Sequence, residues 1–351
     1  MNERVERLRA ELDRLGVASF LVTNPVNVEY LAGFASSNAF VLVTREQVVL
    51  LTDGRYIEAA RTVPGVDVVQ LDRDLARALA PRLGELAEAP VGVEAEHMTL
   101  AVHEHLRGSG VELVPATGVV LGLRAVKEPA ELDTIRRAAR ILSDVYERLS
   151  AEAVVGRTER ELAWWIERAM HEEGAHDVAF STIVAAGPNA ALPHHHPGDR
   201  RIEAGDIVLV DAGARLDGYC SDCTRTFATG PLPEELQRAY STCRSAQEAA
   251  LAAVTVGADA KGLDAIAARE ISQGGFEVKH GLGHGVGLEV HELPVLRPEA
   301  DGTLAAGNVV TIEPGAYLPD LGGVRVEDLV IVTDDGPEVL TSFSKELLTL
   351  E

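Results

Sequence analysis

The amino-acid sequence predicts an α+β protein of two domains, a smaller α/β domain followed by a larger domain of long helices and strand hairpins. Short β-prone runs alternate with helical segments over the first third of the chain, whereas Gly- and Pro-rich hairpins separate long amphipathic helices in the rest. The chain has 351 residues, of which 46% are hydrophobic and 25% charged, so it can bury a large core.

The first domain is expected over residues 1–122. Residues 3–15 carry apolar side chains at helical spacing and are followed by Gly16, which predicts a helix ended by a C-terminal glycine. The further segments expected here are strands at 18–23, 40–44, 48–52 and 111–114 and helical stretches around 54–62 and 71–88. Their alternation is typical of an α/β layer.

The second domain is expected over residues 123–351. A long helix should begin at Pro129, because proline is favourable at a first helical position and one apolar stripe follows it. The helices expected in this domain lie at about 129–150, 159–173, 233–255 and 259–273. The segments between them are rich in glycine and proline and predict strand hairpins.

Charge and composition restrict the partners. The 32 basic and 55 acidic residues give a net charge of −23, which repels phosphate backbones and anionic lipid, so nucleic acid and membrane partners are not expected. No apolar run approaches the roughly 18 residues of a membrane span. The charged amphipathic start lacks the apolar segment of a signal peptide, and the 3 cysteines do not form a disulfide framework. We therefore expect a cytoplasmic protein.

A first hairpin is predicted between residues 206 and 230, where two β-prone runs flank the turn signal Asp217-Gly218. A two-residue turn pairs Leu216 with Tyr219, and this register places Asp211 and Asp222 on one face. Because Asp211 lies in an otherwise apolar strand, its charge needs compensation, and a cation would provide it.

A second hairpin is predicted around residue 320. Glu313 and Glu327 are equidistant from its centre, so they should face one another across the ladder, where like charges repel. The segment 280–292 between the two hairpins is rich in glycine and histidine, and His284 can supply an imidazole ligand.

These four carboxylates and one histidine could converge from three segments. Four negative charges brought together need about four positive ones, which two divalent cations supply. Oxygen-rich ligation with one imidazole suits Mn²⁺, Co²⁺, Fe²⁺ or Zn²⁺, and such paired ions serve hydrolysis.

The motifs themselves resemble those of the pita-bread metallopeptidases. In chain order they are V-D-A-G-A, S-D-C-T-R-T-F, G-H-G-V-G-L-E-V-H-E, T-I-E-P-G and G-V-R-V-E-D. The Xaa-Pro peptidases, prolidase and aminopeptidase P, are the most similar branch, because A-L-P-H, N-P-V-N-V-E-Y-L-A-G-F and T-D-G-R-Y also look like theirs. The resemblance implies a creatinase-like, ribonuclease-H-like α/β domain followed by a pita-bread catalytic domain.

The resemblance also implies a set of metal ligands. Asp211 would bind one metal, His284 and Glu313 the other, and Asp222 and Glu327 would bridge the two, with a hydroxide between the metals. In the family, the residue matching Glu313 also accepts the proton of the nucleophilic water and passes it to the leaving nitrogen.

Three further residues receive roles from the resemblance. His194 and His291 match histidines that bind substrate and stabilise the tetrahedral intermediate, and Arg325 matches an arginine that pairs with the site's carboxylates.

The resemblance predicts a metallopeptidase that hydrolyses the Xaa-Pro bond of short proline-containing peptides with two divalent ions per subunit. Mn²⁺ is favoured over Co²⁺ or Zn²⁺, and a homodimer is expected. A dipeptidase is favoured; aminopeptidase P activity on longer peptides is the alternative. A non-catalytic binding protein of the same fold is a remote third hypothesis, since such a protein would be expected to lack one or more of the five ligands, which are all present.

Other patterns have simpler explanations. The run from His194 to His196 could be a metal-binding tract, but an exposed loop is favoured. Cys220 and Cys223 have a redox or zinc spacing, although residues three apart on a strand point to opposite faces. The segment 53–56 is either a polar turn or a contact to a neighbouring subunit's active site.

Overall fold

The computed structural model describes residues 3–351 and divides into two compact units, which meet in sequence between Arg124 and Ala125. The boundary expected at 122 falls within helix α7 (Val119–Ala125). Met1 and Asn2, with which the expected first domain begins, lie outside the described residues. Over residues 3–351, no helix combines the length and the apolar character needed to cross a membrane.

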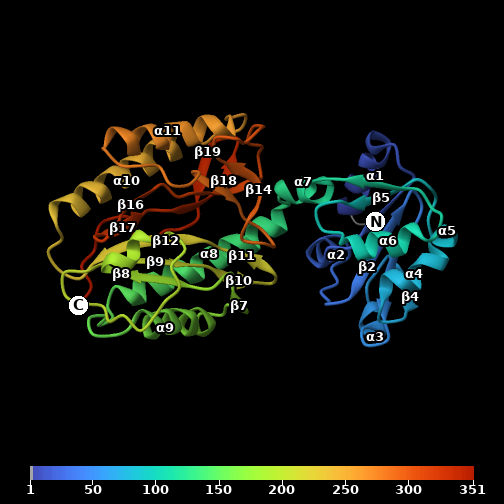
Figure 1. Ribbon diagram of the computed structural model, residues 1–351, viewed down its shortest axis with the longest axis horizontal. Helices are drawn as coiled ribbons and strands as arrows, with labels where there is room; N and C mark the ends of the chain where they lie inside the picture. Colours follow the sequence, from blue (N-terminus) through green and yellow to red (C-terminus); the bar gives the residue numbers. More distant parts are fainter. Residues whose placement is uncertain (1–2) are drawn as a thin grey trace. The chain divides into compact units, whose positions relative to one another are not determined.

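The first unit is built on one six-stranded sheet of order β4-β3-β2-β1-β5-β6 (Figure 1). Its strands are β1 (Ser19–Val22), β2 (Ala39–Thr44), β3 (Val48–Asp53), β4 (Asp67–Leu71), β5 (Val91–Glu94) and β6 (Leu113–Ala116). Its helices are α1 (Glu3–Leu15), α2 (Pro25–Ala32), α3 (Ile57–Ala60), α4 (Leu75–Leu79), the 3₁₀ turn η1 (Ala80–Arg82), α5 (Leu83–Leu86), α6 (Leu100–Arg107) and α7. The α/β layer expected from the alternation is confirmed.

Several short elements of this unit differ from the sequence prediction. The helical stretch expected around 71–88 is present over residues 75–86, but β4 includes residue 71 and the 3₁₀ turn around Pro81 separates α4 from α5. Proline lacks the N–H that would continue the helix. The sequence prediction also missed α2, although Asn24 caps its first turn and Gly33 ends it with a left-handed φ of 63°.

The second unit contains four long helices, as the apolar periodicity predicts. They are α8 (Pro129–Leu149), α9 (Glu159–Glu172), α10 (Glu234–Ala252) and α11 (Ala260–Gln273). Its strands are β7 (Asp177–Val178), β8 (Ile183–Ala186), β9 (Ile207–Ala212), β10 (Ala214–Leu216), β11 (Tyr219–Cys220), β12 (Cys223–Ala228), β13 (Gly283–Gly285), β14 (Glu292–Leu296), β15 (Val309–Ile312), β16 (Gly315–Leu318), β17 (Gly322–Arg325), β18 (Asp328–Thr333) and β19 (Gly336–Val339). The 3₁₀ turn η2 (Gly187–Ala191) follows β8.

Helices cover both faces of the strands in this unit: α8 and α9 lie on one side, and α10 and α11 lie side by side on the other (Figure 1). Strand β9 separates two apolar cores, because Val208 and Val210 pack with α8 and α9 whereas Ile207 and Leu209 pack with α10 and α11. This explains why β9 is apolar on both faces. Asp211 lies on the same face of β9 as Ile207 and Leu209. Its negative charge on this apolar face needs compensation.

Candidate metal centre

The first hairpin has the register that its turn predicts. Asp217 and Gly218 form the turn with φ of 48° and 86°, and Leu216 pairs with Tyr219. The same register continues into the β9–β12 ladder, where Asp211 lies opposite Thr224. The two-residue turn therefore determines which face of the hairpin Asp211 occupies.

The second hairpin is likewise symmetric about residue 320. Gly315 pairs with Arg325 in the β16–β17 ladder, and Ile312 pairs with Asp328 in the β15–β18 ladder, with one common register. Glu313 and Glu327 lie between these two ladders at equivalent positions, where the pairing is interrupted. The common register therefore places two like charges at equivalent positions of the hairpin, where a cation can compensate both.

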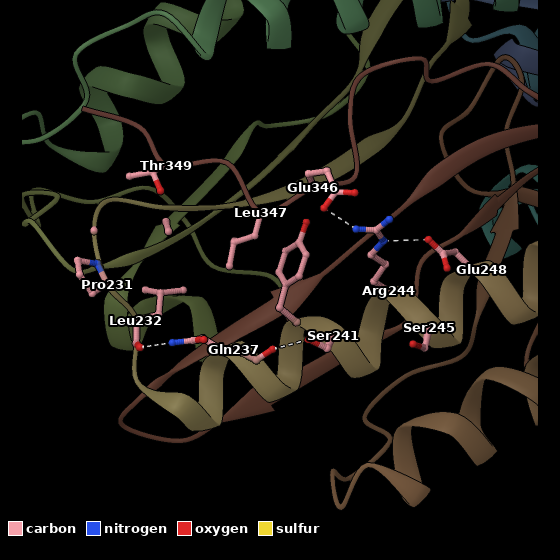
Figure 2. Close-up of a pocket in the computed structure, with 13 residues that line it drawn as sticks. Pro231, Leu232, Gln237, Ser241, Arg244, Ser245, Glu248, Glu346, Leu347 and Thr349 are labelled. Atoms are coloured by element: carbon pink, nitrogen blue, oxygen red, sulfur yellow. Dashed lines mark hydrogen bonds and ion pairs between the residues drawn. The ribbon is translucent and has the colours of Figure 1, made fainter.

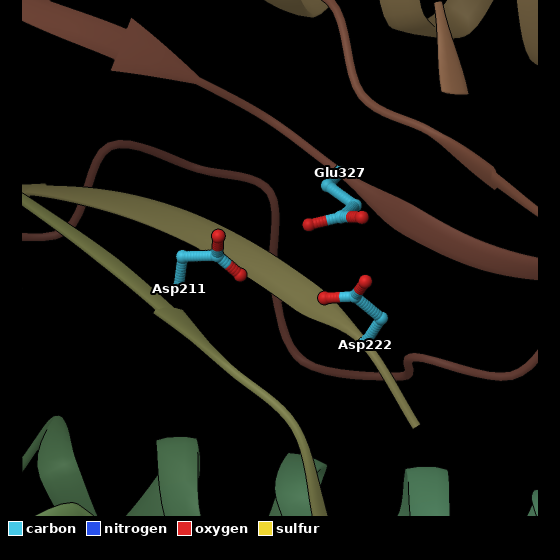
Figure 3. Close-up of side chains that lie close together, drawn as sticks. All are labelled: Asp211, Asp222 and Glu327. Carbon is cyan, nitrogen blue, oxygen red and sulfur yellow. The ribbon is translucent and has the colours of Figure 1, made fainter. Parts of the chain in front are cut away.

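The two hairpins bring three carboxylates together. Ligand oxygens of Asp211, Asp222 and Glu327 all lie within 4.8 Å of one another, and the three residues are 8%, 4% and 1% exposed (Figure 3). Neither Oδ1 of Asp211 nor Oε1 of Glu327 has a hydrogen-bond partner among the described residues. A buried carboxylate oxygen without a donor is costly, so this cluster needs either a bound cation or retained protons.

The pKa values of the three carboxyl groups also show that burying these negative charges together is unfavourable. Burial raises the pKa of Asp222 and of Glu327 well above the ordinary range, and the neighbouring negative charges raise both further. Burial also raises the pKa of Asp211, although Arg325 opposes this effect. Without a cation, the three groups are therefore not all ionised at neutral pH.

His284 and Glu313 lie beside this cluster. Nε2 of His284 is 3.3 Å from Oε1 of Glu313 and 3.7 Å from Oδ2 of Asp222. Nδ1 of His284 lies 3.1 Å from the carbonyl oxygen of Gly285, which fixes Nδ1 as the donor and leaves Nε2 directed at the carboxylates. A Cβ on Gly283 would stand 2.1 Å from the carbonyl oxygen of Thr311, so only glycine allows β13 this close to β15.

The protonation of His284 and Glu313 is linked. Burial alone would lower the pKa of His284, but the contact with Glu313 outweighs it and raises the pKa to about 9. Burial alone would raise the pKa of Glu313, but His284 and Arg325 hold it below its ordinary value. The metal-free site thus favours an imidazolium beside a carboxylate, and a divalent cation would replace that proton.

The structure therefore brings all five predicted ligands into one buried site. Four carboxylates and one imidazole suit a hard or borderline divalent cation, and the two oxygens without donors provide open ligand atoms. The residues present fit a divalent metal centre.

Arg325 connects the site to three strands. Its Nη2 donates to Oδ2 of Asp211 at 2.6 Å, its Nε to the hydroxyl of Thr224 at 2.9 Å, and its Nη1 to the hydroxyl of Tyr317 at 3.0 Å. It is 2% exposed, and these contacts agree with the predicted pairing to carboxylates. Arg325 thus restrains Asp211 through a charged hydrogen bond.

The sequence prediction missed Thr224, whose hydroxyl donates to Oε2 of Glu327 at 2.7 Å while accepting from Arg325. Thr224 lies two residues after Asp222, so its position on the same face of the strand could have revealed it. Tyr317, also missed, links Arg325 to Nε2 of His280 at 2.8 Å. Its position could not be read from a motif because three separate segments meet there.

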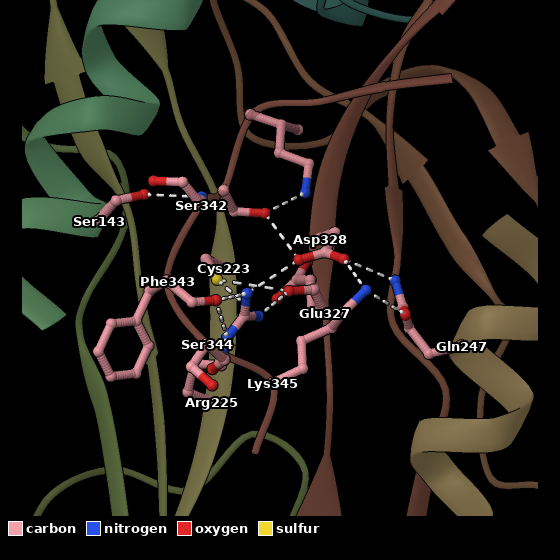
Figure 4. Close-up of polar contacts among 12 residues, drawn as sticks. Ser143, Cys223, Arg225, Gln247, Glu327, Asp328, Ser342, Phe343, Ser344 and Lys345 are labelled. Carbon is pink, nitrogen blue, oxygen red and sulfur yellow. Dashed lines mark hydrogen bonds and ion pairs between the residues drawn. The ribbon is translucent and has the colours of Figure 1, made fainter. Parts of the chain in front are cut away.

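A second polar network holds the backbone beside Glu327 (Figure 4). Arg225 donates to the carbonyl oxygens of Glu327 and Phe343 and to Oδ1 of Asp328. Burial alone would raise the pKa of Asp328, but Arg225 and Lys345 lower it below the ordinary value. The backbone at Glu327, just before β18, is therefore held by an ionised pair.

The three consecutive histidines have different surroundings. His194 and His196 are exposed, whereas His195 lies 2.8 Å from the buried carboxylate of Glu159 and is 13% exposed. The favoured description as an exposed loop is thus wrong for His195. His291 packs edge to face on His284 with ring centroids 4.3 Å apart. Burial lowers the pKa of His291, and the neighbouring positive charge of His284 lowers it further.

The two other sequence patterns have structural explanations. Cys220 ends β11 and Cys223 begins β12; the two are unbridged and buried in different apolar cores, so they do not form a redox or zinc pair. Asp53 is buried at the end of β3 and accepts hydrogen bonds from Asn38 and from Arg55, as in a polar turn.

A cavity of about 610 Å³ also occurs in the second unit, between α10 and the C-terminal segment (Figure 2). None of the predicted site residues lines it. Arg244, which lines this cavity, is neutralised by Glu248 and Glu346.

Comparison with known proteins identifies the class of this molecule. The family model of metallopeptidase family M24 matches residues 133–334, and the model of the creatinase/prolidase N-terminal domain matches residues 4–126. The chain belongs to metallopeptidase family M24, with the pita-bread fold preceded by a creatinase-type domain.

Particular relatives cover nearly the whole chain. The Xaa-Pro dipeptidase of Pyrococcus furiosus is 34% identical over an alignment of 357 positions, which covers 99% of this chain and 100% of that protein. The solved structure of a Xaa-Pro dipeptidase from Bacillus anthracis matches with a TM-score of 0.95 and 35% identity, covering 99% of each chain. That of an X-Pro aminopeptidase from Thermotoga maritima matches with a TM-score of 0.90 and 32% identity, also covering 99% of each chain.

Proposed function

We propose that this protein is a Xaa-Pro dipeptidase that binds two divalent metal ions per subunit. The observation that carries the proposal is the convergence of Asp211, Asp222 and Glu327, with two donor-free buried oxygens, beside His284 and Glu313. The substrate class is supported by the relatives named Xaa-Pro dipeptidase that match over 99% of this chain.

Each of the five ligands has a proposed role. Asp211 would bind one ion, His284 and Glu313 the other, and Asp222 and Glu327 both. Bound divalent ions would polarise the scissile carbonyl and lower the pKa of the attacking water. Mn²⁺ is favoured by the excess of carboxylate oxygen over imidazole.

The side chains would carry the proton transfers and hold the substrate. Glu313, whose pKa lies below its ordinary value, is ionised and can accept a proton from the attacking water before returning it to the leaving proline nitrogen. His194 and His291 would donate hydrogen bonds to the substrate and to the developing oxyanion. Arg325 would keep Asp211 in its ligating orientation through the 2.6 Å contact.

The main alternative is an aminopeptidase P that acts on longer peptides, because the chain is also similar to the X-Pro aminopeptidase of Thermotoga maritima. The two activities differ in whether the protein binds the free carboxylate that the proline of a dipeptide substrate carries. The proposal further includes a domain boundary near residue 122, a homodimer and a cytoplasmic location, as the sequence and the family resemblance suggest.

One experiment tests these activities together. The protein is stripped with EDTA, reloaded with Mn²⁺, Co²⁺ or Zn²⁺, and incubated with Ala-Pro, Ala-Pro-Ala and the control Ala-Ala. We expect hydrolysis of Ala-Pro and metal content of two per chain. Cleavage of Ala-Pro-Ala alone would favour the aminopeptidase, and cleavage of neither proline peptide at full metal content would favour a binding protein.

A further inference from the structure

The loop between β8 and β9 carries the histidine that the proposed function assigns to substrate. Within residues 3–351, His195 is the one of its three consecutive histidines whose side chain has a hydrogen-bond partner: its Nε2 lies 2.8 Å from Oε2 of Glu159. The side chain of His195 is 13% exposed and that of Glu159 is 0% exposed. His194 and His196 are exposed on either side of it.

Glu159 is the first residue of α9, and four donors surround its carboxylate. Oε1 accepts from the backbone N–H of Ala186 at 2.8 Å and from Nδ2 of Asn189 at 2.9 Å. Oε2 accepts from His195 and from the backbone N–H of Gly198 at 3.1 Å. Four donors can stabilise a fully buried carboxylate, and all four belong to β8 or the loop that follows it.

These contacts also show which ring nitrogen of His195 donates a hydrogen bond. Burial alone would raise the pKa of Glu159, but its hydrogen bonds lower it below the ordinary value, so the group is a carboxylate. An ionised carboxylate only accepts hydrogen bonds, and therefore Nε2 of His195 carries the hydrogen.

The start of α9 holds the far end of the loop as well. The backbone N–H groups of Glu159 and Arg160 donate to the carbonyl oxygens of Arg200 and Gly198 at 3.0 and 3.1 Å. The N-terminal N–H groups of a helix lack partners within the helix. These two bonds therefore give the first N–H groups of α9 their acceptors and also restrain the loop.

A second anchor lies on the other side of His194. Nη1 of Arg325 donates to the carbonyl oxygen of Pro193 at 3.3 Å, and Arg325 also binds Asp211. His194 thus lies between a residue tied to the candidate metal centre and a residue tied to Glu159. Its backbone cannot shift or reverse without breaking one of the two contacts.

We infer that Glu159 and His195 are positioning residues, which hold the 187–198 loop so that His194, among the three histidines, is presented to the substrate. The inference rests on the proposed role of His194. His195 acts through His194 and does not itself touch the reacting atoms. Releasing the loop should lower turnover because small misplacements of a positioned donor have large effects on rate.

The test compares single and double variants of the manganese-loaded protein. We expect His195→Ala to lower kcat/KM for Ala-Pro about tenfold, with metal content unchanged. His195→Gln places an N–H donor near the former Nε2 and should restore activity to within about twofold. The exposed neighbour supplies the control, since His196→Ala should leave activity unchanged.

A double variant separates positioning from an independent effect. In the His194→Ala background, adding His195→Ala should cost less than about twofold, because the residue being positioned is already absent. Multiplication of the two single effects, or a His195→Ala variant as active as the parent, would overturn the inference.

Hydrogen exchange provides a readout that does not depend on peptidase activity. His195→Ala should speed amide exchange in residues 186–198, including Gly198, without changing the exchange of β9. Unchanged exchange in this loop would contradict the inference. If the parent protein holds two metal ions but cleaves neither Ala-Pro nor Ala-Pro-Ala, the proposed function fails, and the exchange result alone decides whether His195 holds the loop.

Discussion

Replacing Asp222 by Asn should change the stability of the metal-free and metal-loaded protein in opposite directions. Asp222 shares a buried cluster with Asp211 and Glu327, with ligand oxygens within 4.8 Å of one another. Two unit charges at this separation repel by about 3.5 kcal/mol at an effective dielectric constant of about 20. The amide has the same shape but no charge, so it removes this repulsion.

The realised gain is smaller than this Coulomb value, because the raised pKa values of Asp222 and Glu327 show that the cluster retains protons when the metal is absent. We expect Asp222→Asn to stabilise the metal-free protein by about 1–3 kcal/mol, which raises the melting temperature by several degrees. The same variant should lose most of the stabilisation that Mn²⁺ gives the parent, along with its peptidase activity.

The assay is thermal unfolding of parent and variant in EDTA and in Mn²⁺, with metal content measured by elemental analysis. Asp217→Asn is the matched control, because Asp217 lies at the exposed tip of the same hairpin and asparagine tolerates its φ of 48°. The reasoning is refuted if the metal-free Asp222 variant is less stable than the parent, or if it holds two metal ions and turns over normally.

Three further outcomes follow from the proposed site. Glu313→Gln should lower kcat at least 100-fold with little change in KM, because the amide keeps an oxygen ligand but cannot transfer a proton, and steady-state kinetics showing parental kcat would exclude the acid/base role. His194→Ala should lower kcat/KM about 100-fold, which corresponds to about 2.7 kcal/mol, at unchanged metal content. A larger loss in His196→Ala would show that His196, and not His194, contacts the substrate. The stabilisation by Mn²⁺ should grow as pH rises from 6 to 9. The pKa of His284 is raised from 6.5 to about 9, so its protonated form stabilises the metal-free fold fully below pH 6.5 and loses this effect through pH 9. Melting temperatures in EDTA and in Mn²⁺ measure the difference, and a difference independent of pH would contradict the competition between proton and metal.

The sequence alone determined the two hairpin registers. A two-residue turn fixes the pairing of the residues on either side of it, so Asp217-Gly218 was sufficient to place Asp211 and Asp222 on one face of the hairpin. The symmetry about residue 320 gave the equivalent positions of Glu313 and Glu327 in the same way. The long helices were also predictable. A helix of 21 residues such as α8 has enough turns for its apolar residues to show a clear helical period.

The tertiary structure alone decided how these local units meet. The 4-residue strand β5 and the helix α2 escaped prediction, because elements of this length carry too few residues for a periodic pattern and are stabilised by distant neighbours. The pairing of His195 with Glu159 joins residues 36 positions apart, and the contact of Arg325 with Pro193 joins residues 132 apart. No local pattern encodes such contacts, because they form only after the helices and hairpins have packed around a common core.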